Sequence, residues 1–438
     1  MDSLFLGLAG LAALLSLIAI RVPVAYTMVL VGLCGTMVLF PPAVLLNQLK
    51  DLAYAQFANY DLSVLPMFVL MGALAARTGL SQDLFRAANA WVGRFRGGVA
   101  MAALLGCAGF GALCGSSTAT ASTMGQVALP ELRRYRFSPS LATGTIAAGG
   151  TLGILIPPSV VLIVYAIIVE VNIVAMFAAA LIPGILAVLL FMATVMIVVR
   201  LREGEGPPAE AVGRKELVAA SLGVLPVLAI FVVVIGGIYA GIYNPTPAAA
   251  IGVVLVGLWG LARGRLRLSA WRDALLETAR TTGMIYLILL GAEILKIFMA
   301  RAGVPQAAAE MLGTSGLGPY VILLIIILAF LALGCLMDSL SMVILAIPFF
   351  WPMVAGLDFG LDPTEQKIWF GIIILVVVEL GLITPPVGLN VFIINAMARD
   401  IPMRETFKGV LPFFGSEIVR IALLIAFPAI SLALPRLL

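Results

Sequence analysis

The chain has 438 residues, of which 62% are hydrophobic and only 11% are charged, and its formal net charge is +4. Soluble domains carry roughly 25% charged residues, so this composition excludes a water-soluble globule and a disordered protein. The small net charge also argues against nucleic-acid binding. An integral membrane protein, in contact with the lipid bilayer, is the class that remains.

The residue types present also restrict the chemistry. Histidine is absent, which removes Ser-His-Asp hydrolysis, His-ligated zinc and imidazole proton relays. The cysteines form no CxxC pair and lie in apolar segments, so we interpret them as small buried hydrophobic residues; they are Cys34, Cys107, Cys114 and Cys335. The pattern of a P-loop is also missing, so ATP hydrolysis by that route is not expected.

Apolar segments along the chain predict a bundle of membrane-spanning helices. A helix needs about 20 apolar residues to cross the hydrocarbon core. The candidate spans are 4–20, 24–41, 62–77, 172–199, 217–241, 247–262, 281–300 and 410–432. Residues 4–20 have no basic n-region before them and no A-x-A site after them, which predicts a retained helix. Two amphipathic pieces, 81–96 and 268–279, are expected along the interface.

Four longer apolar regions are interrupted. Residues 98–130 and 318–352 contain small polar clusters near their centres, which predicts re-entrant helical hairpins. Residues 138–170 and 367–398 each contain a Pro-Pro pair. Because proline lacks an N–H and disfavours helical geometry at the residue before it, each of these two regions is predicted to be two half-helices with an unwound linker.

Three short matches suggest an internal repeat. Val-Leu-Val-Gly-Leu-x-Gly occurs at 29–35 and 254–260, Leu-Gly-Ala at 290–292 matches 70–73, and Gly-x-x-x-Pro-Pro occurs at 153–158 and 381–386. Because the matches keep the same order at nearly one offset, they predict two homologous halves. The predicted domains are a first repeat over 1–200, a cytoplasmic linker over 201–216 and a second repeat over 217–438.

The basic residues predict how the halves are oriented. If each hairpin enters and leaves the membrane on the same side, 20 of the 26 Lys and Arg residues fall on one common side of the membrane and four on the other. By the positive-inside rule the first side is cytoplasmic. The hairpins then enter from opposite faces, which predicts inverted-topology repeats.

The polar residues at these interruptions are the candidate site. In the first hairpin, Ser116, Ser117 and Thr118 follow a glycine-rich run. Non-helical backbone at membrane depth is tolerated only inside protein or beside a water-filled cavity, where its oxygen atoms suit a dehydrated Na⁺. The alternative interpretation is a small-residue packing face between helices.

The two Pro-Pro regions contribute a matched pair of broken helices, which is a pointer to a transporter's midplane binding site. An ordinary proline kink is the alternative for each of them. The candidate residues are Thr151, Gly153, Pro157, Pro158 and Ser159 in the first region, and Thr384, Pro385, Pro386, Gly388 and Asn390 in the second.

The second hairpin contains Asp338, Ser339 and Ser341. A carboxylate near membrane depth costs at least ~2.5 kcal/mol, so Asp338 is expected either to take part in a cation site or to cap the following half-helix. Glu379 lies one turn before the second break, and the sequence leaves open whether it couples protons or is a structural partner.

Two further pairs of charges have i,i+3 spacing within spans. Glu293 with Lys296, and Glu417 with Arg420, are expected to neutralise each other as structural pairs. The alternative is that Lys296 or Arg420 attracts an anionic substrate.

These motifs resemble those of a known family. Ser-Ser-Thr-Ala-Thr at 116–120, Gly-Ile-Leu-Ile-Pro-Pro-Ser at 153–159, Ile-Thr-Pro-Pro-Val-Gly-Leu-Asn at 383–390 and Leu-Pro-Met-Phe-Val-Leu-Met-Gly at 65–72 are similar to the large membrane subunit of TRAP transporters, the DctM-type or M-subunit permease. The resemblance covers essentially the whole chain.

The resemblance implies an all-α, multi-pass permease of the bacterial inner membrane that works by an elevator mechanism and is not an enzyme. It implies sodium-driven import of a small carboxylate, such as a C4-dicarboxylate or sialic acid, delivered by a periplasmic binding protein. A small four-helix membrane subunit is expected as a separate chain, because this sequence begins directly at the large subunit. No cofactor is expected besides Na⁺ as the coupling ion, for which Ser117, Asp338 and Thr384 are candidate ligands.

Other functions remain open from the sequence. A stand-alone ion-coupled carboxylate carrier or a Na⁺/H⁺ exchanger would need no binding protein. An intramembrane hydrolase built on Ser116 and Ser117 lacks a histidine base. A passive channel is less consistent with paired broken helices, which favour alternating access.

Overall fold

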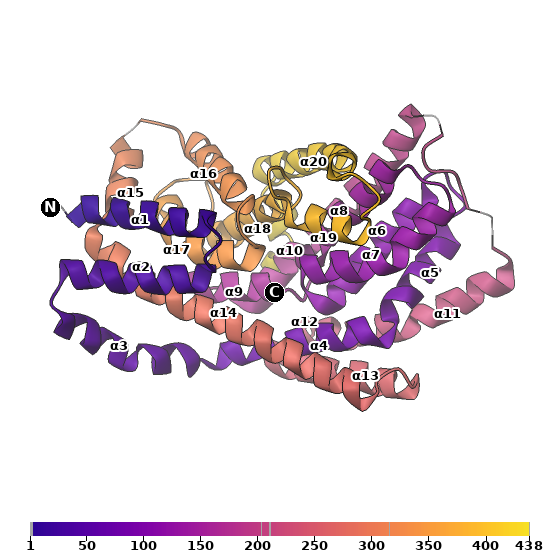
Figure 1. Ribbon diagram of the computed structural model, residues 1–438, viewed down its shortest axis with the longest axis horizontal. Helices are drawn as coiled ribbons and strands as arrows, with labels where there is room; N and C mark the ends of the chain where they lie inside the picture. Colours follow the sequence, from indigo (N-terminus) through magenta and orange to yellow (C-terminus); the bar gives the residue numbers. More distant parts are fainter. Residues whose placement is uncertain (1–2, 203, 210–211, 315, 438) are drawn as a thin grey trace.

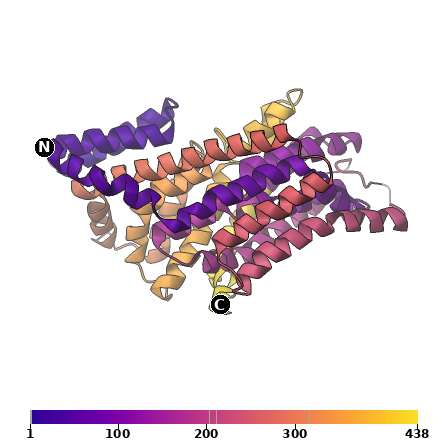
Figure 2. The same ribbon diagram turned by 90° about the horizontal axis from the view of Figure 1, so that it is seen from below.

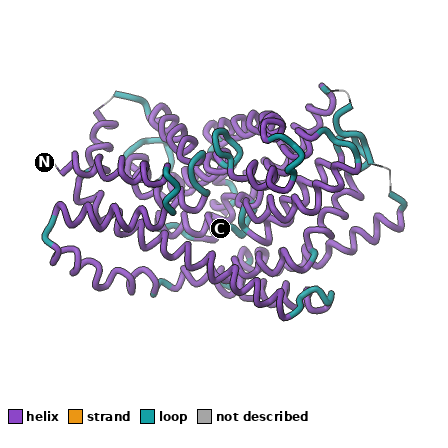
Figure 3. The backbone as a smooth tube through the Cα atoms, in the orientation of Figure 1, coloured by secondary structure: helices purple, strands orange, loops and turns teal. Residues whose placement is uncertain are grey.

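The computed structural model describes residues 3–202, 204–209, 212–314 and 316–437, and in these ranges the chain forms helices and no strands. Figure 3 shows loops mainly as short connections between helices. In the first part of the chain the helices are α1 (Ser3–Ala19), α2 (Val24–Leu39), α3 (Pro42–Phe57), the 3-10 turn η1 (Tyr60–Ser63), α4 (Val64–Thr78), α5 (Leu80–Val92), α6 (Gly98–Cys114), α7 (Ser117–Arg134), α8 (Pro139–Leu155), α9 (Val160–Val169) and α10 (Ile173–Leu201).

The second part of the chain is also helical among the described residues. Its helices are α11 (Arg214–Phe231), the π-helical segment η2 (Val232–Gly236), α12 (Gly237–Tyr239), α13 (Pro245–Ala262), α14 (Leu268–Ala302), α15 (Val304–Thr314), α16 (Pro319–Gly334), α17 (Ser339–Ala355), α18 (Pro363–Gly381), α19 (Leu389–Met397), α20 (Met403–Ala426), α21 (Ala429–Leu432) and the 3-10 turn η3 (Pro435–Leu437).

Within the described part of the chain, six helical segments are long and apolar enough to cross a membrane, or seven if the bent pair α8–α9 counts as one span. The first two helices lie at the predicted segments 4–20 and 24–41, but they are too short to count among these spans. α1 has 17 residues and α2 has 16, so each rises only about 25 Å, less than the roughly 30 Å of a hydrocarbon core. Prolines lie at both boundaries: α2 starts after Pro23, and α3 starts at Pro42 after Pro41.

The prediction for residues 268–279 was also wrong. These residues form no separate interfacial helix but are the first turns of α14, a continuous helix of 35 residues. No proline interrupts this stretch, so the backbone hydrogen bonds run on. The other amphipathic piece is a separate helix, α5, which ends at Val92 where Gly93 and Gly97 follow.

The helices pack in two groups. The outer layer consists of α1, α2, α4, α11, α13 and α14, in which α14 packs on α2 and α4, and α13 packs on α4. Figure 2 shows α14, α4, α13 and α11 side by side. The hairpin bundle consists of α6–α10 and α16–α20 and lies on the other side of α14 and α4 (Figure 1).

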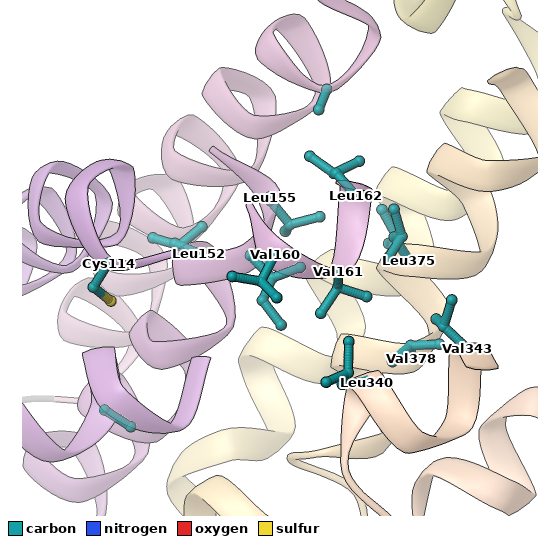
Figure 4. Close-up of a cluster of buried hydrophobic side chains, with 14 of the residues drawn as sticks. Cys114, Leu152, Leu155, Val160, Val161, Leu162, Leu340, Val343, Leu375 and Val378 are labelled. Carbon is teal, nitrogen blue, oxygen red and sulfur yellow. The ribbon is translucent and has the colours of Figure 1, made fainter. Parts of the chain in front are cut away.

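The core of the hairpin bundle is formed by helices that are apolar all round. Every residue of α8 from Ser140 to Leu155 is buried, and α18 is buried almost without interruption from Gln366 to Gly381. Such helices have no polar face to turn outward, so they take the centre of the bundle. Figure 4 shows where residues of α9, among them Val160 and Val161, meet Leu340 of α17 and Val378 of α18.

Helix breaks occur at the predicted interruptions. The first hairpin turns at Gly115, whose φ of +60° is left-handed, and the second between Gly334 and Ser339. The first Pro-Pro region separates α8 from α9, which are bent by 44°, and the second separates α18 from α19. Both Pro-Pro peptide bonds are cis. The predicted breaks are therefore confirmed, while the inverted orientation of the halves stays a prediction.

Candidate functional site

A cavity of about 700 Å³ lies between the outer layer and the hairpin bundle. It is bordered by α4 and α14 on one side and by both hairpin turns on the other. Its size falls in the usual range for small-molecule sites, about 300–1,000 Å³. Polar members of its lining are Arg77, Ser116, Ser117, Thr118, Ser122, Thr123, Gln126, Glu277, Thr281, Asp338 and Ser339.

The first hairpin contributes a row of hydroxyl groups to this cavity. Ser116 is the N-cap of α7, and its Oγ accepts a hydrogen bond from Ala119 N at 3.4 Å. Its hydroxyl also lies 3.3 Å from Thr118 Oγ1. Gly115 lets the turn pack closely on the first break, because a Cβ there would lie 2.7 Å from Pro158 O. The structure thus brings the predicted residues 116–118 together at the cavity.

The second hairpin contributes a carboxylate. Asp338 lines the cavity and is the N-cap of α17: its Oδ2 accepts from Ser341 N at 3.1 Å and its Oδ1 accepts from Ser341 Oγ at 2.5 Å. Of the two sequence interpretations, the capping role is confirmed. A role in a cation site is compatible with this cap, since Asp338 also faces the cavity, but it stays a prediction.

Glu379 joins the two hairpins. Its side chain is 1% exposed, and its carboxylate accepts hydrogen bonds from Ser117 Oγ of the first hairpin and from Ser339 Oγ of the second, the latter at 2.7 Å. Both serines are the first helical residues of their helices, α7 and α17. Sequence reasoning identified Glu379 as a possible structural partner, but nothing in the sequence indicated which residues it joins.

The candidate residues of the first Pro-Pro region stand behind the hairpin turn and do not line the cavity, although their neighbours Ile154, Val160 and Val161 do. Ser159 caps α9 by accepting from Leu162 N at 3.3 Å. Thr151 is buried and donates to Ala148 O at 2.6 Å. Gly153 packs so closely that a Cβ there would lie 2.7 Å from Ser116 O. Pro157 and Pro158 are buried as well.

The residues of the second Pro-Pro region also lie outside the lining. Thr384 donates to Leu380 O at 2.6 Å, and Pro385 O accepts from Cys335 Sγ at 3.3 Å. Asn390 donates to Ala147 O at 3.3 Å, which ties α19 to α8. Pro386 is exposed, and Gly388 has a φ of +62°. Of the three candidate Na⁺ ligands, the structure places Ser117 and Asp338 at the cavity and Thr384 elsewhere.

Sequence reasoning missed two charged residues of the cavity. Arg77 of α4 forms an ion pair with Glu277 of α14, with 2.7 Å between Arg77 Nη2 and Glu277 Oε2, and its Nη1 donates to Ala73 O at 2.6 Å. The partners are 200 residues apart, so no local pattern could have paired them. Together with Asp338, they give the described lining one positive and two negative formal charges, a sum of −1.

The predicted i,i+3 charge pairs are confirmed as pairs. Glu417 and Arg420 are buried and 2.5 Å apart, and Glu293 and Lys296 are more exposed and 3.4 Å apart. None of the four residues lines the cavity.

Three of the cysteines are buried as predicted, and no disulfide joins cysteines in the described part of the chain. The prediction was wrong for Cys34, which is exposed. It lies two residues after Gly32, which packs against α14, and two residues correspond to about 200° around a helix.

Several long apolar helices, helices broken inside the bundle and an internal cavity lined by hydroxyl and charged groups together define a membrane transport protein. Residues 11–430 match the family described as "Tripartite ATP-independent periplasmic transporter, DctM component". The chain belongs to this family, whose large permeases are inner-membrane proteins.

Similar proteins agree with this assignment. The chain is 36% identical to the C4-dicarboxylate TRAP transporter large permease protein DctM of Pseudomonas aeruginosa, over 92% of this chain and 93% of that protein. It is 30% identical to the sialic acid TRAP transporter large permease protein SiaM of Vibrio cholerae, over 86% and 87%. The crystal structure of the Alcanivorax borkumensis YdaH transporter shares the fold, with a TM-score of 0.57, 15% identity and coverage of 88% and 89%.

Proposed function

We propose that this protein is the large permease of a tripartite, sodium-coupled importer of small carboxylates. The relatives named for C4-dicarboxylates and sialic acid both act on organic acids, which supports a carboxylate substrate. The observation that carries the proposal is the composition of the cavity, in which hydroxyl groups from the first hairpin face a carboxylate from the second.

The charge of this cavity gives a physical reason for cation coupling. Its described charged residues, Arg77, Glu277 and Asp338, sum to −1, so a carboxylate that enters alone meets net repulsion. A cation bound between Asp338 and the hydroxyl groups of the first hairpin removes that repulsion. Na⁺ and carboxylate therefore each favour binding of the other, and this mutual dependence is the basis of coupling.

The two helix groups have different roles in this transport cycle. The hairpin bundle carries the substrate and moves in the manner of an elevator against the outer layer. The outer layer contributes Arg77 and Glu277, which are already paired with each other and which form the opposite wall of the cavity.

The proposal also includes partner proteins. The family name describes a tripartite periplasmic transporter of which this chain is one component, which supports a periplasmic binding protein and a small membrane subunit. The outer helices present large apolar side chains on their surface, such as Tyr26 and Met37 of α2 and Tyr54 of α3. These surfaces are suited to contact with lipid or with a membrane subunit.

The test is uptake into liposomes that contain this protein and the small subunit, with the binding protein and a radiolabelled dicarboxylate outside. We expect uptake with an inward Na⁺ gradient and none when the gradient is collapsed by an ionophore. Uptake that is unchanged without the gradient contradicts sodium coupling. Uptake that is equally fast without the binding protein contradicts the tripartite assembly and favours a stand-alone carrier.

A further inference from the structure

Glu379 is the side chain through which the two hairpins are hydrogen bonded to one another. Ser117 lies 262 residues before it in the sequence, and Ser339 lies 40 residues before it. Each serine uses a different oxygen of the carboxylate. Because the side chain is 1% exposed, water does not compete for these bonds.

The two bonds are equivalent in their local structure. Ser117 follows the N-cap Ser116 of α7, and Ser339 follows the N-cap Asp338 of α17. The Glu379 side chain therefore accepts from the first residue of both helices. This arrangement offsets part of the cost of burying the carboxylate.

The same two helix starts form one wall of the cavity. Ser116 and Asp338, which directly precede the two serines, both line it. Glu379 also lies two residues before Gly381, where a Cβ would come within 2.7 Å of Gly334 Cα, so the other arm of the second hairpin is packed tightly at this point. The two hairpin turns are therefore linked to each other through Glu379.

We propose that Glu379 is a positioning residue that holds the two hairpin turns at a fixed separation, so that a ligand bound at one turn prepares the other turn for binding. The second half of this statement rests on the proposed function, because it concerns the cation and the carboxylate. The first half concerns structure alone and is tested separately.

The structural test measures the distance between the hairpins. Spin labels are placed at Gln126→Cys on α7 and Leu336→Cys in the second turn, both exposed positions, in a Cys34→Ser background, and pulsed EPR gives the distance distribution. We expect a single narrow distribution in the otherwise unchanged protein and a broader one in Glu379→Ala. Glu379→Gln is expected to restore the narrow distribution, because the amide accepts from one serine and donates to the other.

A matched control lies on the same helix. Gln366 is buried in α18 and donates to Val354 O and Leu357 O, away from the hairpin turns. Gln366→Leu removes two buried hydrogen bonds and is expected to leave the distribution narrow. If Glu379→Ala does not fold, Ser117→Ala and Ser339→Ala each remove one bond and are each expected to broaden it. A distribution that stays narrow in the variants that fold overturns the proposal.

The functional test uses the same variants in the uptake assay. With Glu379→Ala we expect the Na⁺ concentration for half-maximal uptake to rise about tenfold, a usual size for coupling between sites, and the Na⁺ dependence to become less steep. Glu379→Gln is expected to remain close to the unchanged protein. Uptake independent of Na⁺ in every variant contradicts the proposed function alone, whereas Na⁺-dependent uptake that Glu379→Ala leaves unaltered overturns the positioning role.

Discussion

Asp338 combines a structural contact with a position at the cavity. Its two oxygens accept from the backbone and the hydroxyl of Ser341, so replacement by alanine removes a cap worth about 1 kcal/mol together with the charge. Asparagine is an equally good N-cap but is neutral. The pair of substitutions therefore separates the two contributions.

We predict that Asp338→Asn keeps its thermal stability in detergent, while the Na⁺ concentration for half-maximal uptake rises about tenfold, which corresponds to ~1.4 kcal/mol. Asp338→Ala is expected to abolish coupled uptake and still fold. Thermal unfolding and Na⁺ titration of uptake measure the two effects. If Asp338→Asn takes up substrate like the unchanged protein, the capping role is sufficient and Asp338 has no part in a cation site.

The Arg77–Glu277 pair sets the charge of the opposite wall. Glu277→Gln changes the formal sum of the described lining from −1 to 0, and Arg77→Gln changes it to −2. At an effective dielectric constant of about 20 and a separation of about 8 Å, one charge changes the interaction with an anion by ~2 kcal/mol. We therefore predict that Arg77→Gln raises the half-saturating carboxylate concentration and that Glu277→Gln lowers it.

The measurement is carboxylate titration of uptake at saturating Na⁺. Arg86→Gln, on α5 outside the cavity lining, is the control for loss of a positive charge on the same side of the protein. Equal shifts for Arg77→Gln and Glu277→Gln would show that the pair acts through packing rather than through charge.

Among the elements, α8 and α20 approach each other most closely through glycine. A Cβ on Gly144 would lie 2.3 Å from Gly409 C, and a Cβ on Gly409 would lie 1.8 Å from Ser140 O. Because both neighbours are backbone, neither can rotate away. We predict that Gly409→Ala lowers stability by about 1–3 kcal/mol, the usual cost of overpacking, measured as a lower midpoint of thermal unfolding.

Gly415 is the control on the same helix, since a Cβ there has no atom within 4 Å. Gly415→Ala is expected to leave stability unchanged or to raise it slightly, because alanine favours helix by about 1 kcal/mol over glycine. If the two substitutions have the same effect, the close approach of α8 and α20 does not limit stability.

The elements also show what the sequence could and could not reveal. Proline pairs and polar clusters act locally, so the breaks at Pro157 and Pro385 and the turns near Ser117 and Asp338 were predictable. Which break reaches the cavity was not predictable, because it depends on how helices pack: Thr384 bonds to its own helix, whereas Ser117 faces the cavity.

Residues that meet only across the fold gave no signal at all. Arg77 is one of many arginines on the basic side, and its pairing with Glu277 depends on the contact of α4 with α14. The sequence analysis also did not predict that α14 is one continuous helix. The amphipathic pattern of 268–279 suggested an interfacial piece, but the backbone continues through these residues as one helix.

At the scale of the whole molecule, the distribution of basic residues predicts that the Arg77 end of the cavity faces the cytoplasm. Arg77 and Glu277 lie at the ends of α4 and α14 that the positive-inside rule assigns to that side. Gln126 lines the same cavity and is exposed. Together with the rule, this exposure predicts a cavity that is open to the cytoplasm.

We predict that Gln126→Cys, in a Cys34→Ser background, reacts with a membrane-impermeant maleimide in inside-out vesicles and not in right-side-out vesicles. Tyr320→Cys, an exposed position at the start of α16, is expected to show the opposite pattern. Labelling of both positions from the same side would contradict the orientation inferred from charge.

The bond from Ser117 to Glu379 has a consequence for how the polypeptide matures. The first hairpin leaves the ribosome and enters the bilayer long before residue 379 has been synthesised, and Asn390, which holds α8, is made later still. Until then, Ser117 lacks Glu379 and α8 lacks Asn390 as hydrogen-bond partners. Polar groups without partners inside a membrane cost free energy. Its final packing therefore waits for translation of the C-terminal portion, and a truncated chain that stops before α18 is expected to be a substrate for membrane quality-control proteases.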